Sequence, residues 1–262
     1  MNDMKKTVLI ISLIALTLAS CSKLERNEKK FLKGMQSEDY EASIQAFNDF
    51  TDWMLKDKAT MTYDFNRMRE QLGMKVITSE DGKLRCYSWP TSVTDTIQTY
   101  TNIIQWMAAD KFVGFNGPID KLLAGRKVNI KKEQTMAHSI DTIFQLKSTT
   151  PTVYLIMQSY RNVNGKERAY VSAACIDGLV LKLLPFFFDG IEIAGNYEYN
   201  ANGTLGINDL FKWDEKTNQF SVYQTDENDN IIPGKHLVYQ LGKDRFVRLP
   251  EPETDTSPKT DN

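Results

Sequence analysis

Short runs of β-branched and aromatic residues, separated by brief turns, fill most of the sequence from residue 74 onward. The turns carry strong local signals, since Asp81-Gly82, Asn164-Gly165 and Asp177-Gly178 are pairs that favour tight hairpins. A parallel connection needs a crossover of a dozen or more residues, and turns this short leave no room for one. Consecutive strands must therefore pair antiparallel, and the sequence predicts a long β meander.

The pattern of apolar residues predicts strands over 74–78, 84–89, 96–107, 138–146, 153–160, 168–176, 179–184, 191–199, 210–213, 220–224, 235–240 and 245–249. Polar turns are expected over 216–218 and 226–234. Residues 110–134 are predicted to be irregular, with one short helix over 119–123, because glycine and proline interrupt them. The interrupting residues are Gly114, Gly117-Pro118 and Gly125.

A helical period precedes the strands. Apolar side chains recur at helical spacing in two segments, first at Tyr40, Ile44, Phe47, Phe50 and Met54, and then at Met61, Phe65, Met68 and Leu72. Ser37 or Asp39 is the expected N-cap of the first helix, and Gly73 is expected just beyond the second. The predicted fold class is α+β: an N-terminal helical pair followed by a long antiparallel β meander, arranged as a curled sheet, a sandwich or a partial propeller-like array.

The N-terminus has the order of a bacterial export signal. Lys5-Lys6 supplies positive charge, an apolar run follows over 8–18, and Leu18-Ala19-Ser20-Cys21 closes it. The run is shorter than the roughly 20 apolar residues that span a membrane. The closing residues resemble the lipobox of bacterial lipoproteins, which implies removal of residues 1–20 and attachment of lipid, with palmitate-type acyl chains, to Cys21. Two alternatives are an export signal followed by a chance cysteine, and an N-terminal anchor helix.

Lipid on Cys21 would tie the protein to a membrane of the cell envelope. Ser22 follows the cysteine, and by resemblance to lipoprotein sorting signals the absence of aspartate there favours the outer membrane. Both the periplasmic and the external face are compatible with the sequence. The expected organisation is a signal peptide over 1–20, a lipidated tether over 21–38, a single α+β domain over 39–249 and a disordered tail over 250–262.

The charge balance bears on the partners of the chain, and the cysteines bear on whether it contains a disulfide. The chain has 32 Lys+Arg and 34 Asp+Glu, a formal net charge of −2, and no basic patch or stripe stands out in the sequence, so nucleic acid is not an expected partner. With Cys21 assigned to lipid, Cys86 and Cys175 are left in an oxidising compartment. They form a disulfide if their strands are adjacent, and otherwise they are buried free thiols.

Residues 79–89 read SEDGKLRCYSW, and an aromatic, amide-containing run, YTNIIQ, follows over 100–105. Together they resemble a recurring pattern, S-x-D-G-x-x-R-x-Y-S-W, in lipoproteins of Gram-negative bacteria whose function is unknown. The resemblance implies a similar architecture and location, and it carries no activity. From the residues alone, Asp81 is expected to accept backbone hydrogen bonds in a tight turn, and Gly82 to supply a positive φ.

Patterns for catalysis and metal binding are weak. His138 and His236 have no companions at ligand spacing, and the run that begins at Asp226 lacks the glycine and glutamate of a calcium loop. The sequence has no nucleophile elbow, phosphate loop or dinucleotide fingerprint, so no metal or cofactor is expected. Paired carboxylates for hydrolysis could come from residues near strand ends, namely Asp177, Asp189, Glu192 and Glu198.

Aromatic residues in the predicted strands offer a binding surface. Trp89, Tyr197 and Tyr199 are candidates for an exposed aromatic face that contacts a sugar or a protein, and the alternative is that they pack in the core. The expected function is a non-enzymatic binding or structural module that engages a protein or a glycan. The alternative is a hydrolase that acts on envelope or extracellular polymers through carboxylates in a sheet cleft.

Overall fold

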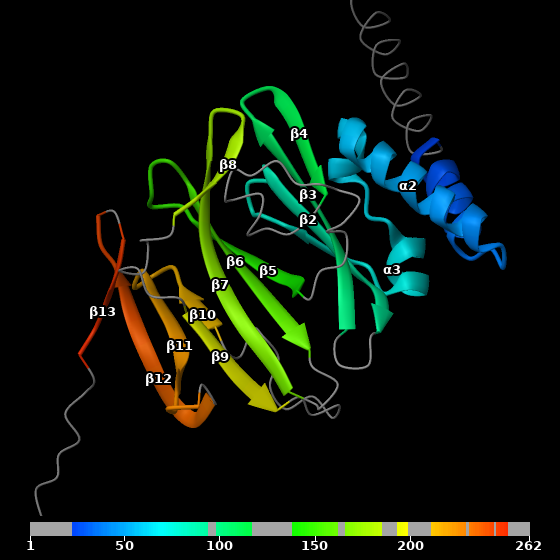
Figure 1. Ribbon diagram of the computed structural model, residues 1–262. Coiled ribbons are helices and arrows are strands. Elements are labelled where there is room, and N and C mark those ends of the chain that lie inside the picture. Colours follow the sequence, from blue (N-terminus) through cyan, green and yellow to red (C-terminus); the bar gives the residue numbers. More distant parts are fainter. Residues whose placement is uncertain are drawn as a thin grey trace, which may run out of the picture.

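The computed structural model describes residues 23–93, 98–116, 138–161, 166–184, 193–198, 211–228, 231–243 and 245–250. Within these ranges a helical layer comes first, and three antiparallel β-sheets follow it along the chain (Figure 1). The predicted α+β class and the antiparallel pairing are confirmed. The signal segment, Cys21, the helix expected over 119–123 and nearly all of the expected tail lie outside the described residues.

The helical layer contains a helical segment over 23–35, α2 (Tyr40–Lys56), the 3-10 helix η1 (Lys58–Thr62) and α3 (Asn66–Leu72). Asp39 is the N-cap of α2, as predicted, and its carboxylate accepts hydrogen bonds from the backbone N–H groups of the first turn. Burial is confined to the C-terminal half of α2, where Phe50 and Met54 face the core, whereas Tyr40 is 76 % exposed.

The second predicted helix is interrupted. Phe65 lies between η1 and α3 with φ 52° and ψ 44°, a left-handed conformation that separates the two elements. Its ring is fully buried and meets the rings of Phe50, Trp53 and Tyr87 edge-on. These contacts offset a backbone cost of about 1–2 kcal/mol. Gly73 ends α3 with φ 66°, as predicted.

The tether expected over 21–38 is largely a helix instead. Residues 23–35 are helical, and the side chains of Leu24, Phe31 and Leu32 are buried. These side chains fall on one side of an α-helix, a pattern that the charged residues between them obscure in the sequence. Phe31 packs edge-on against Phe50 of α2. The segment therefore belongs to the folded domain.

The first sheet has the order β1-β2-β3-β4. Its strands are β1 (Lys75–Thr78), β2 (Leu84–Val93), β3 (Gln98–Ala108) and β4 (Lys111–Asn116). The prediction of irregular structure was wrong over β4. Gly114 does not break the strand: a Cβ there would lie 3.0 Å from Cα of Leu55, so glycine lets β4 approach the backbone of α2.

The second sheet contains β5 (His138–Leu146), β6 (Val153–Arg161), β7 (Lys166–Asp177), β8 (Val180–Leu183) and β9 (Ile193–Glu198). Its order is β5-β6-β7-β8, and β9 also pairs with β7. The third sheet has the order β10-β11-β12-β13. Its strands are β10 (Phe211–Asp214), β11 (Gln219–Thr225), β12 (Ile231–Leu241) and β13 (Phe246–Arg248). The predicted strands of both sheets are confirmed, although β12 begins four residues earlier than expected.

Three apolar cores hold these layers together in chain order. The helical layer packs on one face of the first sheet, with buried side chains that include Phe50, Phe65, Tyr87 and Trp89. The other face of the first sheet packs on the second sheet through Cys86, Ile104, Tyr154 and Ile156, among others. The second sheet then packs on the third through Leu155, Met157, Phe211 and Phe220, among others.

Candidate functional site

Trp89, expected on an exposed aromatic face, lies in the core instead. It is 3 % exposed, and its indole meets the ring of Phe50 edge-on. The two-residue period of β2 places it on the same side as Tyr87, toward the helical layer. Tyr197 lies in β9. The side chain of Tyr197 and the whole of Tyr199 lie outside the described residues.

Cys86 and Cys175 are free, buried thiols. Cys86 faces the core between the first and second sheets. Cys175 pairs in register with Val153, whose side chain faces the core on the other side of the second sheet. The second sheet thus separates the two sulfur atoms, which cannot form a disulfide without opening it. Burial raises the pKa of both thiols and keeps them neutral.

The turn between β1 and β2 has the predicted form and also joins two sheets. Asp81 Oδ1 accepts hydrogen bonds from the Ser79 hydroxyl (2.7 Å) and the Lys83 backbone N–H (3.0 Å), and Gly82 has φ 68°. Asp81 Oδ2 accepts a hydrogen bond of 2.9 Å from the Tyr154 hydroxyl of the second sheet. Burial and this hydrogen bond raise the pKa of Tyr154, which keeps its hydroxyl a donor.

The following motif residues attach η1 to the first sheet. The guanidinium of Arg85 donates hydrogen bonds to the backbone carbonyls of Met61 and Tyr63. The buried hydroxyl of Tyr87 lies 2.8 Å from the carbonyl oxygen of Thr60. The residues of SEDGKLRCYSW that lie in this turn and on this face of β2 therefore act in packing and turn formation.

The other candidate residues do not converge. Asp177, at the end of β7, pairs with Lys182 of β8 at 3.3 Å. The ring of the exposed His236 lies tilted against that of Tyr223, at 4.3 Å between ring centroids. Asp226 accepts a backbone hydrogen bond within its own turn. Four candidates have side chains outside the described residues: His138, Asp189, Glu192 and Glu198. Within the described ranges, no three His, Cys, Asp or Glu side chains gather as metal ligands do.

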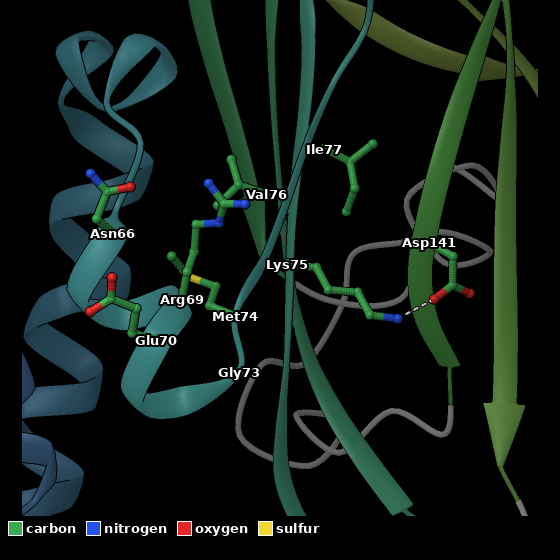
Figure 2. Close-up of a pocket in the computed structure, with 9 residues that line it drawn as sticks. All are labelled: Asn66, Arg69, Glu70, Gly73, Met74, Lys75, Val76, Ile77 and Asp141. Carbon is green, nitrogen blue, oxygen red and sulfur yellow. Dashed lines mark hydrogen bonds and ion pairs between the residues drawn. The ribbon is translucent and has the colours of Figure 1, made fainter. Parts of the chain in front are cut away.

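A groove of about 630 Å³ lies along the outer edge of β1 (Figure 2). α3 lines one side with Asn66, Arg69 and Glu70, and β5 lines the other with Asp141. Residues 73–77, at the start of β1 and just before it, lie between these walls. Among the described strands β1 pairs only with β2, so its second edge is unpaired.

The register of β1 identifies the backbone groups on that edge. The backbone N–H of Ser79 donates to the carbonyl of Leu84 at 2.8 Å, and residues along an antiparallel strand face their partner alternately. The backbone groups of Ile77 therefore point toward β2, and those of Val76 and Thr78 point away from it. Such unpaired N–H and C=O groups are a template for another extended segment.

A charged pair lies beside this edge. Lys75 of β1 donates to Oδ1 of Asp141 and, at 3.0 Å, to the hydroxyl of Ser139. The Asp141 side chain is 5 % exposed, and its Oδ2 is buried without a hydrogen-bond partner among the described residues. The pairing of β5 with β6 shifts register between Ile140 and Thr142, so Asp141 occupies an irregularity that redirects its side chain.

The charged residues that α3 places on the other wall of the groove are not paired with described residues as Lys75 and Asp141 are. Arg69 and Glu70 are exposed, and neither forms an ion pair or a side-chain hydrogen bond with another described residue. Adjacent positions on a helix do not face each other, so both charges are available to a ligand. Sequence reasoning missed this groove because its residues come from α3, β1 and β5, and the hydrophobic pattern of each element gives no sign that the three meet.

No known protein family, curated protein or solved structure matches the chain. No helix in the described ranges is both long enough and apolar enough to cross a membrane. The function must therefore be inferred from the chemistry of the N-terminus and of the groove.

Proposed function

We propose that the protein is a lipid-anchored lipoprotein of the cell envelope, held in the outer membrane, and that it binds a protein partner without catalysing a reaction. The partner contributes an extended segment that pairs with the outer edge of β1. The observation that carries this proposal is the outer edge of β1, which no described strand pairs with and which lies between two charged walls.

The lipid anchor is supported by the order of residues at the N-terminus. Basic residues, an apolar run and Leu18-Ala19-Ser20-Cys21 follow one another as they do in lipoprotein signals. Two or three acyl chains suffice for stable anchoring, since each buried methylene contributes about 0.8 kcal/mol. Ser22, which replaces the aspartate of an inner-membrane retention signal, favours the outer membrane.

Strand addition is the recognition mode that suits this groove. Main-chain hydrogen bonds to Val76 and Thr78 would supply affinity, and alternate side chains of the bound segment would contact the two walls. One side would meet Arg69 and Glu70, and the other would meet the Lys75 ion pair. A protein is favoured over a glycan because none of the described lining residues is aromatic, whereas sugars are commonly bound on aromatic faces.

The hydrolase alternative receives less support from the groove. Glycoside hydrolysis needs two carboxylates at a working separation across one bond. Asp141 is engaged by Lys75, and Glu70 lies on the opposite wall (Figure 2).

For the fold, we propose the propeller-like alternative among those that the sequence left open. The first and third sheets are meanders of four strands in sequential order, and the second begins with one. The first hairpin turns of all three sheets lie at one end of the molecule, where Lys147 contacts Glu80 at 2.5 Å and Glu215 at 3.2 Å. An experimental structure with the three sheets arranged about a common axis would support this proposal, and a parallel stack would contradict it.

The anchor is tested by mass spectrometry of the N-terminal peptide and by fractionation of a Cys21→Ala variant. Acyl chains on a peptide that begins at Cys21, and release of the variant from membranes, are the expected results. An unmodified cysteine within an intact N-terminus would refute the anchor. Protease treatment of intact cells, with a periplasmic protein as the control, then shows which face of the outer membrane carries the domain.

The groove is tested by selecting peptides from a random display library on the purified protein. Selected peptides should lose binding when alternate backbone amides are N-methylated, which removes strand pairing and leaves the side chains in place. Thr78→Pro should also abolish binding, because proline removes the outward N–H. Thr78→Val, which changes the side chain and keeps the outward N–H, is the control. Selected peptides that tolerate both changes, or a signal on a glycan array that depends on Arg69, would refute strand addition.

A further inference from the structure

The helical segment 23–35 carries its basic residues on one side of the helix and its acidic residues elsewhere. Five of its exposed residues are basic: Lys23, Arg26, Lys29, Lys30 and Lys33. At about 100° per residue, these five positions fall within an arc of about 120° around the helix axis. Their arc lies opposite the buried side chains of Leu24, Phe31 and Leu32. We call this arc the basic face.

The two carboxylates of the segment lie outside the basic face and are engaged elsewhere. Glu28 is 1 % exposed and accepts hydrogen bonds from the Tyr63 hydroxyl (2.6 Å) and the Met68 backbone N–H (3.0 Å). Glu25 pairs with Arg67 at 3.1 Å. The basic face therefore holds five cations and no carboxylate of its own helix, although the whole chain has a net charge of −2.

A solvated helix surface usually mixes charges of both signs, because neighbouring like charges destabilise it. Here the four lysines of the basic face form no ion pair with another described residue. Such a face is suited to an anionic surface that supplies the missing negative charge. Sequence analysis missed it because the cations are interrupted by Leu24, Glu25 and Glu28, and only the helix collects them on one side.

We propose that the basic face lies on the anionic phospholipid headgroups of the membrane that holds the anchor. This inference rests on the proposed lipid at Cys21, which is two residues before Lys23, so that acyl chains and basic face meet the bilayer together. The proposed acyl chains would by themselves hold the protein in the membrane, so the basic face would determine which side of the domain lies on the bilayer. The helical layer then faces the membrane, and the third sheet, on the opposite side of the molecule in Figure 1, points away from it.

The test measures the amine reactivity of individual lysines in the full protein. Protein purified from membranes is placed in vesicles of phosphatidylcholine alone, or of phosphatidylcholine mixed with phosphatidylglycerol. It is labelled briefly with an amine-reactive reagent, and each peptide is quantified by mass spectrometry. Labelling of the four lysines of the basic face should fall about threefold or more in the anionic vesicles, and high salt should restore it.

Three exposed lysines of the third sheet, Lys212, Lys216 and Lys235, are internal controls whose labelling should be the same in both vesicles. Equal labelling of the basic face in both vesicles would overturn the inference. Protection in native envelopes but not in anionic vesicles would also overturn it, and would point to an acidic protein. The N-terminal peptide of the same digest reports the anchor separately: an unlipidated protein with a protected basic face would refute the lipid on Cys21 and leave the membrane contact standing.

Discussion

The carboxylate of Glu28 accepts a hydrogen bond from the backbone N–H of Met68, 40 residues later, at 3.0 Å. α3 begins after the left-handed Phe65, which supplies no side-chain cap. The first turn of a helix leaves backbone N–H groups without partners, and Glu28 satisfies one of them from a neighbouring helix. The same carboxylate also accepts a hydrogen bond from Tyr63. Glu28 therefore joins the segment 23–35 to α3.

Glu28→Ala should lower the free energy of unfolding by about 2–4 kcal/mol. It removes a helix cap and leaves the buried N–H of Met68 and the partly buried hydroxyl of Tyr63 without their acceptor, and a buried unpaired donor alone costs about 1–3 kcal/mol. Urea denaturation of the purified protein measures the change. Glu25→Ala is the matched control on the same helix, because its ion pair with Arg67 is exposed to solvent and contributes little to stability. Equal effects of the two substitutions would contradict the capping role.

Lys75→Ala should destabilise the protein by about 1–3 kcal/mol, because it leaves the carboxylate of Asp141 buried without its cation. Adding Asp141→Asn should recover most of that loss, since the buried group is then neutral. A double-mutant cycle measured by urea denaturation gives the coupling between the two residues. Additive effects of the two substitutions would show that Lys75 and Asp141 have no coupling free energy, which would contradict the stabilising role of the ion pair.

Both buried thiols should resist modification in the folded protein. Burial raises the pKa of Cys86 and Cys175, so at any pH near 7 or 8 less of the reactive thiolate is present than in the unfolded chain. Reaction with Ellman's reagent should be slow in native buffer and rapid in denaturant, and raising the pH should accelerate it. The protein from membranes should titrate two thiols when unfolded, because the proposed lipid would block the thiol of Cys21. A third thiol would contradict the anchor, and fewer than two would indicate a disulfide.

Gly114→Ala should cost about 1–3 kcal/mol, although Gly114 lies in a strand where alanine is conformationally allowed. The added Cβ would lie 3.0 Å from Cα of Leu55, and a backbone neighbour cannot move as a flexible side chain does. Thermal unfolding would show the loss. Lys111→Ala, at an exposed position of the same strand, should change stability by less than about 0.5 kcal/mol.

Sequence periodicity predicted elements well where local signals agreed with the tertiary fold. Asp39 and the spacing of Phe50 and Met54 define α2, and Asp81-Gly82 defines the first hairpin. Periodicity failed where tertiary contacts override local signals. Gly114 has the local signature of a strand breaker, and only the approach of Leu55 explains its place in β4.

The functional surfaces were harder to predict than the elements. The two-residue period of β2 shows which residues share a face of the strand with Trp89. It does not show which face is buried, and in the structure the helical layer covers the face that carries Trp89. The groove needs α3, β1 and β5 to meet, and its two walls come from residues far apart in the chain, such as Arg69 and Asp141. The meeting of these three elements depends on how the layers pack in the folded protein, and no short stretch of sequence contains that information.

In the part of the chain that the structure describes, each layer is built from one stretch of sequence, and the three apolar cores join it to the layers made just before and just after it. A polypeptide emerging from its N-terminus can therefore bury each new sheet on a surface that already exists, without waiting for distant residues. The last described sheet has no later layer to bury, but it cannot be dispensed with, because its removal would expose the apolar face of the second sheet that carries Leu155 and Met157.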